Sequence, residues 1–156
     1  LDSFYHRMKY STYGSESIFG GMAVKDMSLT PTEYWQRQCY VGASFLRPVE
    51  APMCREIGID NVMWGSDYPH IEGSHPHTRE HLRLTFAQLP IAETTKLLTT
   101  NAARVYKFDL AALAPLAEQW CPTKAEVATP IAYAEIPETA KGCPGMNPLN
   151  QIESAA

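Results

Sequence analysis

Two continuous apolar runs in the middle of the chain have the pattern of buried parallel strands. The first covers residues 39–45 (CYVGASF) and the second covers residues 61–66 (NVMWGS). Neither run alternates with polar side chains, as expected when both faces of a strand are buried. Residues 48–57 have helical character, with Gly58 placed to end the helix. This order of strand, helix and strand, with about a dozen residues between the strands, predicts a right-handed parallel crossover.

Upstream of the first strand, the pattern predicts a helix, a long loop and a second, short helix. Apolar side chains in residues 1–10 recur at helical spacing, whereas residues 11–28 contain several glycines and predict a loop. Thr30 can accept a hydrogen bond from the third amide of a helix, and Glu33 can reach back to the cap, which is the pattern of a capping box. The helix that begins there is expected to end near Gln38.

A longer amphipathic helix is predicted over residues 78–89, and Pro90 stops it. The side chains near one face of this helix are His81, Leu82, Thr85, Phe86 and Leu89. As polar groups on a helix, His81 and Arg83 are expected to be solvated.

Three further helical stretches follow. One is predicted over residues 92–99 and the next over residues 101–106, with Asn101 ending the first and starting the second. Asp109 is a suitable cap for a helix over residues 110–120. From Cys121 onward prolines recur, so the tail is expected to be an extended arm with at most one helical turn.

Composition and charge exclude several classes of protein. Hydrophobic residues make up 45% of the chain and charged residues 19%, which is typical of a globular protein. The net charge is -4 and the basic residues are scattered, so nucleic acid is not an expected partner. No apolar run approaches the roughly 20 residues that span a bilayer, and we expect a cytoplasmic protein with no membrane partner. The four cysteines form no C-x-x-C pair and are expected to be reduced thiols, two of them in the core.

Candidate chemistry is concentrated in residues 65–70 (GSDYPH) and in the following residues 72–80 (EGSHPHTRE). Asp67 lies where the second strand is expected to end. The carboxyl ends of buried parallel strands are where α/β proteins gather their catalytic groups. A carboxylate at this position is therefore a candidate catalytic group.

Several segments in order resemble one family. NVMWGSDYPH, EGSHPHTREHL, IAETTKLLTTNAARVYKFDL and LAPLAEQW resemble the C-terminal segment of amidohydrolase-related proteins of the aminocarboxymuconate semialdehyde decarboxylase type. The upstream TPTEYWQRQCYVGASF is similar to that family's approach to its seventh strand. The resemblance implies an α/β fold in which residues 1–120 are the C-terminal part of a (β/α)8 TIM barrel and residues 121–156 a proline-rich arm. Because such a barrel needs about 250 residues, we expect the rest of the barrel to be a necessary partner.

The resemblance gives Asp67 a role. In that family the aspartate that ends the eighth strand binds a divalent metal, usually zinc, and handles a proton during catalysis, and Asp67 matches it. The family's other ligands are an H-x-H pair after the first strand and histidines after the middle strands, and none of these motifs is in this chain. Taken alone, Asp67 would be expected to cap the turn after a strand, but the surrounding motif favours the metal ligand.

His70 completes the family's aspartate-tyrosine-proline-histidine order, which implies that it orients Asp67 or lines the pocket. The other interpretation is a hydrogen-bonded loop histidine. Trp64 and Tyr68 flank the aspartate and are expected to be packing residues.

The loop beyond His70 offers weaker candidates. His75 and His77 have H-x-H spacing, but the proline between them directs their side chains apart, so they are expected to be an outer-loop feature. Glu72 and Arg79 could pair with one another or meet an acidic substrate, and a surface salt bridge is favoured for each.

Two functions follow from these observations. The first is a metal-dependent enzyme, either a hydrolase or a non-oxidative decarboxylase of a small carboxylated or cyclic substrate, for which the isolated segment is expected to be inactive. The second is a non-catalytic fragment or interaction module that lacks the metal-binding histidines. A proline-rich arm can wrap around a neighbouring subunit, which makes a homo-oligomer a further candidate assembly. An H-x-H motif upstream in the coding sequence would favour the enzyme.

Overall fold

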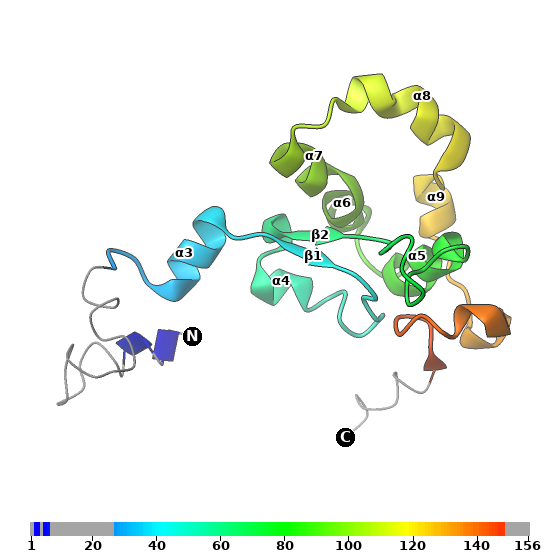
Figure 1. Ribbon diagram of the computed structural model, residues 1–156, viewed down its shortest axis with the longest axis horizontal. Helices are drawn as coiled ribbons and strands as arrows, with labels where there is room; N and C mark the ends of the chain where they lie inside the picture. Colours follow the sequence, from blue (N-terminus) through cyan, green and yellow to red (C-terminus); the bar gives the residue numbers. More distant parts are fainter. Residues whose placement is uncertain (1, 4, 7–26, 149–156) are drawn as a thin grey trace. The chain divides into compact units, whose positions relative to one another are not determined.

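The computed structural model describes residues 2–3, 5–6 and 27–148 (Figure 1). The chain divides into two compact units, residues 1–40 and residues 41–156. Of the helix expected over residues 1–10, residues 2–3 and 5–6 are helical and the rest lies outside the described residues. The loop expected over residues 11–28 lies almost entirely outside them.

The first unit contains the helix α3, Pro31–Gln38, which begins and ends as predicted. The amide of Glu33 donates to the Thr30 hydroxyl oxygen at 3.3 Å, and the Thr30 amide donates to the Glu33 carboxylate at 2.7 Å. The reciprocal pair satisfies two amides that the first helical turn leaves without partners, and it confirms the predicted capping box.

The second unit is built on two parallel strands, β1 (Val41–Ala43) and β2 (Val62–Trp64), with Val41 opposite Val62 and Ala43 opposite Trp64. The pairing confirms that the two strands are parallel, and the right-handed sense of the crossover stays a prediction. Its helix is shorter than predicted: α4 covers only Cys54–Ile57, and residues 48–53 form turns. Pro52 lacks the amide hydrogen that a longer helix would use there. Gly58 ends α4 with φ 110°, in the region that favours glycine, as predicted.

The two strands differ in burial. Val62 and Met63 in β2 are buried, whereas Val41 is 36% exposed and Gly42 is also exposed. The expectation that both strands are buried on both faces is therefore wrong for β1. The described residues give β1 only one neighbouring strand, and they form no closed barrel.

Helices follow β2 in the order α5 (Thr78–Phe86), α6 (Ile91–Thr95), the π-helical η3 (Lys96–Thr100), α7 (Asn101–Tyr106), α8 (Leu110–Trp120) and α9 (Lys124–Val127). A 3-10 turn, η2, covers Ile59–Asn61 just before β2. The main core lies where β2, α5, η3 and α9 meet, and its buried members are Ala51, Cys54, Val62, Leu82, Phe86, Leu97 and Val127. No helix among residues 27–148 is both long enough and apolar enough to cross a membrane.

Asn101 connects a helix to the sheet. As expected, it marks the boundary between two helical segments, because η3 ends at Thr100 and α7 begins at Asn101, although the two follow one another without a break. The side chain is 2% exposed, and its amide nitrogen donates to the carbonyl oxygens of Ile59 and Val62, each at 2.7 Å. These two bonds attach the start of α7 to η2 and to the start of β2.

The helix α8 is capped as predicted, because the Asp109 carboxylate accepts from the amides of Ala111 at 2.9 Å and Ala112 at 3.1 Å. None of its residues is buried. Leu116 and Trp120 are 56% and 69% exposed.

The segment after α8 is folded rather than extended. Besides α9 it forms two 3-10 turns, η4 (Tyr133–Glu135) and η5 (Glu138–Ala140). Pro137 is the cap residue of η5, with φ -57°, so a proline here starts a helical turn. The expectation of an extended arm with at most one helical turn is therefore wrong for residues 121–148. This segment contributes the second core cluster, Ile136, Ala140, Cys143 and Met146.

Two of the four cysteines, Cys54 and Cys143, are buried, as predicted. Burial raises the pKa of both thiols, because a thiolate would lose its hydration there.

Candidate functional site

Asp67 lies at the carboxyl edge of the parallel strand pair. The chain leaves β2 at Trp64, and the Gly65 amide still donates to the Ala43 carbonyl at 3.2 Å, which keeps the ends of the two strands together. Because both strands run in the same direction (Figure 1), their carboxyl ends meet at one edge. Asp67 lies in the loop that leaves β2 at this edge, just after Gly65 and Ser66.

The backbone at Asp67 is left-handed, with φ 57°. Aspartate and asparagine tolerate this conformation better than other side chains with a Cβ. The Asp67 side chain is 37% exposed, so its carboxylate is accessible while remaining part of a defined turn.

The structure brings His70 against Asp67. The His70 Nδ1 atom lies 3.3 Å from Asp67 Oδ2, and the His70 amide donates to the Asp67 carbonyl at 2.8 Å. Glu72 contributes a second carboxylate, with Oε2 3.8 Å from the same imidazole nitrogen. An imidazole between two carboxylates on the surface can orient one of them, which is the role predicted for His70.

Gly73 closes this loop, a contribution that the sequence analysis missed. A Cβ atom at Gly73 would lie 2.8 Å from the Ser66 carbonyl oxygen, 2.9 Å from that of His70 and 3.0 Å from that of Asp67. Only glycine fits where three carbonyls converge. The presence of a glycine between Glu72 and Ser74 is the feature of the sequence that could have indicated this close backbone approach.

Asp67 and His70 have the side-chain chemistry of metal ligands. Carboxylate and imidazole are ligands that divalent metals use, and zinc sites in enzymes have three protein ligands. Among the residues that the structure describes, no three His, Cys, Asp or Glu side chains gather in a way that could hold a metal. Asp67 therefore fits as one ligand, and these residues do not make a complete site.

The side chains of His75 and His77 have different partners. The His75 ring packs edge-on against Tyr68, with ring centroids 5.0 Å apart, and His77 Nε2 lies 2.9 Å from the Thr139 hydroxyl. Tyr68 is 67% exposed, so the expectation that it is a packing residue is wrong. Trp64, in contrast, packs against the main core as expected.

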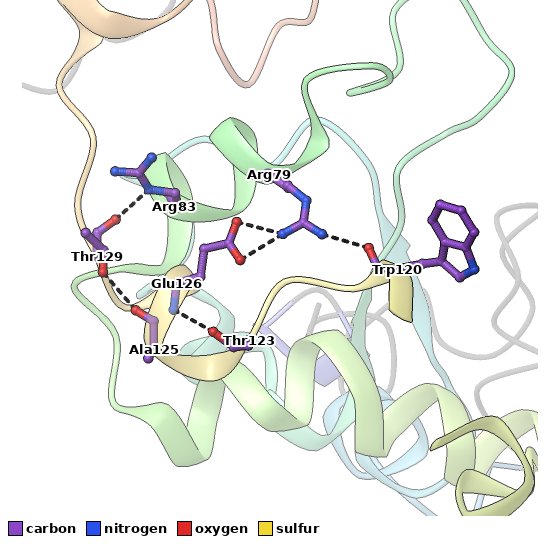
Figure 2. A network of polar contacts seen from close by, with 7 residues as sticks. All are labelled: Arg79, Arg83, Trp120, Thr123, Ala125, Glu126 and Thr129. Atoms are coloured by element: carbon purple, nitrogen blue, oxygen red, sulfur yellow. Dashed lines mark hydrogen bonds and ion pairs between the residues drawn. The ribbon is translucent and has the colours of Figure 1, made fainter. Parts of the chain in front are cut away.

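Arg79 forms a surface salt bridge, as predicted, but its partner is Glu126 rather than Glu72 (Figure 2). Arg79 Nη1 donates to both Glu126 carboxylate oxygens, at 2.7 and 2.8 Å, and Nη2 donates to the Trp120 carbonyl at 2.9 Å. These bonds hold the pKa of Glu126 below its usual value. No sequence signal near Arg79 indicated a partner this far along the chain.

His81 is fully buried, so the expectation of a solvated charge is wrong. Its Nε2 lies 3.0 Å from the Leu46 carbonyl oxygen, which can only accept, so the proton is on Nε2. The Thr85 hydroxyl donates to the same carbonyl at 3.1 Å. Burial lowers the pKa of His81, because the charged imidazolium would lose its hydration, although the Leu46 carbonyl partly opposes this shift.

We expect this histidine to make stability pH-dependent. Since the folded pKa lies below the ordinary value of 6.5, the unfolded chain binds more protons between the two values. The contribution of the neutral ring to folding is therefore complete above pH 6.5 and is lost progressively as the pH falls toward the folded pKa. The midpoint of thermal unfolding, measured near pH 7.5 and near pH 5.5, should fall less in His81→Gln than in the wild type.

The control for this prediction is Thr85→Val, which removes the other donor to Leu46 but no titrating group. It should be less stable than the wild type at both pH values while keeping the wild-type pH difference. An unchanged pH difference in His81→Gln would contradict the prediction.

Comparison with known proteins identifies the family. A family profile described as amidohydrolase matches residues 18–108, which is more than half of the chain and includes both strands, the Asp67 loop and the helices α5 to α7. Neither the curated proteins nor the solved structures give a significant match to the chain. The family-level resemblance of the sequence is thus confirmed, while its closer likeness to the decarboxylase type stays a prediction. The chain belongs to the amidohydrolase family.

Proposed function

We propose that this chain provides the last strands of a metal-dependent amidohydrolase TIM barrel, and that Asp67 is the ligand it contributes to a divalent metal. The observation that carries the proposal is the position of Asp67, at the carboxyl edge of a parallel strand pair within the stretch that matches the family. Catalytic groups of such barrels gather at that edge.

In this proposal Asp67 and His70 act together. The Asp67 carboxylate binds the metal, which the resemblance indicates is zinc, and accepts a proton during the reaction. His70 contacts Oδ2 and limits the rotation of the carboxylate, which makes it a positioning residue. When bound, the metal would polarise a substrate oxygen or lower the pKa of a water molecule. The remaining ligands would come from the rest of the barrel.

The reaction class is a hydrolysis or a non-oxidative decarboxylation of a small carboxylated or cyclic substrate. Both reactions use the same barrel edge, and the loops that distinguish substrates lie on other strands.

The second candidate is a non-catalytic interaction module. It is favoured by the exposure of Val41 in β1 and by the lack of a three-ligand cluster among the described residues. An H-x-H motif after a first strand, upstream in the coding sequence, would decide for the enzyme.

Metal removal tests the proposal directly. The full-length protein should convert members of a panel of small cyclic amides and aromatic carboxylates, with CO2 release separating decarboxylation from hydrolysis. A chelator should abolish turnover, and added Zn²⁺ should restore it. Turnover that survives complete removal of the metal would contradict the proposed metal dependence.

A further inference from the structure

The segment after α8 contacts both loops that leave the carboxyl ends of the strands. We define the C-terminal strap as residues 121–146. We infer that this strap holds the loop that carries Asp67, and that Gly145 and Thr139 are positioning residues for the site. The inference rests on the proposed function for its catalytic meaning, but not for the contacts that support it.

The first half of the strap is fixed to α5 (Figure 2). Arg79 pairs with Glu126 at 2.7 Å, and Arg83 donates to the carbonyls of Thr129 at 2.9 Å and Pro130 at 3.0 Å. Val127 is 4% exposed and belongs to the main core. The strap is thereby attached to the helix that directly follows the Asp67 loop.

The second half reaches the loop after β1. Phe45 in that loop packs against the strap's buried cluster, whose members are Ile136, Ala140, Cys143 and Met146. The backbone of Gly145 approaches so closely that a Cβ atom would lie 2.5 Å from His81 Nε2, 2.9 Å from the Phe45 carbonyl oxygen and 3.1 Å from the Leu46 carbonyl oxygen. Two of these three atoms belong to the backbone, and the third belongs to a buried ring, so none can yield easily.

The strap also reaches the loop after β2. The Thr139 hydroxyl lies 2.9 Å from His77 Nε2, near the end of the loop that starts at Asp67. The Ser74 hydroxyl in that loop lies 3.0 Å from the Thr78 hydroxyl at the start of α5, and the Ser74 amide donates to the Ser66 carbonyl at 2.9 Å. A displacement at His77 would therefore be passed on to the residues beside Asp67.

Metal ligands depend on such support. Groups bonded directly to a metal ligand typically change metal affinity about 10–100-fold when they are replaced, and more distant supports have smaller effects. Thr139 and Gly145 touch no reacting group, and they act through His77, Phe45 and Leu46. Their replacement should loosen the Asp67 loop and weaken metal binding.

The test uses two matched pairs of variants in the full-length protein. Gly145→Ala introduces the collision, whereas Gly142→Ala adds a Cβ that would meet nothing within 4 Å. Thr139→Val removes the hydroxyl at nearly constant volume, whereas Thr139→Ser keeps it. Hydrogen exchange of residues 66–77 and the affinity for Zn²⁺ are measured for all four variants and the wild type.

We expect faster exchange of residues 66–77 and Zn²⁺ binding weakened by up to about 10-fold in Gly145→Ala and Thr139→Val, with wild-type values in Gly142→Ala and Thr139→Ser. If Gly145→Ala does not fold, the threonine pair carries the test. Wild-type exchange of residues 66–77 in Thr139→Val and in any folded Gly145→Ala protein would overturn the inference. Failure of the proposed function looks different, because turnover would then be independent of metal while the exchange difference persisted.

Discussion

Replacing Asp67 with asparagine in the full-length protein should lower turnover by about 10²–10⁴-fold, the usual contribution of a positioned proton acceptor. The amide keeps the size of the carboxylate but has neither its charge nor its ability to accept a proton at neutral pH. For the same reason, the metal content of the purified protein, measured by elemental analysis, should also fall.

Asparagine is the appropriate substitution because of the backbone at this position. With φ 57°, alanine would add conformational strain to the loss of the carboxylate, whereas asparagine tolerates the left-handed region about as well as aspartate. The matched control is Asp60→Asn, since Asp60 precedes β2 at its other end and forms a surface ion pair with Lys96 at 2.8 Å. Equal turnover and metal content in the two variants would show that Asp67 does not belong to the metal site.

Replacing Asn101 with alanine should destabilise the protein by about 2–4 kcal/mol. The change leaves the Ile59 and Val62 carbonyls without the donor that now lies 2.7 Å from each, and a buried carbonyl without a partner costs about 1–3 kcal/mol. The measurement is the free energy of unfolding from chemical denaturation of the full-length protein.

Thr100→Ala is the control for this prediction, because Thr100 is the preceding residue and is exposed. It should change the free energy of unfolding by less than about 0.5 kcal/mol, as surface substitutions usually do. A similarly small effect of Asn101→Ala would mean that other groups or water satisfy the two carbonyls.

The features that were predicted correctly depend on neighbouring residues. The Thr30 capping box, the Asp109 cap and the glycine at position 58 each involve side chains and amides within a few positions of one another. The position of Asp67 beyond a parallel strand also follows from local sequence, since the strand's apolar run ends just before it.

The features that were missed depend on distant partners. The burial of His81 is set by Leu46 and Gly145, and the strap is folded because Arg79 and Arg83 on α5 bind its backbone and side chains. A sequence pattern that spans about a dozen residues does not predict contacts with residues much further along the chain. For this reason, proline frequency alone led to the incorrect prediction of an extended arm after residue 120.

The left-handed turn at Asp67 also provides a criterion for judging other amidohydrolases that carry this turn. Glycine and asparagine suit φ 57° at least as well as aspartate does, so folding alone does not require an acidic side chain there. A relative with glycine or asparagine at the corresponding position would keep the turn but lack the carboxylate. Under the proposed function, such a substitution would mark relatives that keep the fold but have lost the metal ligand.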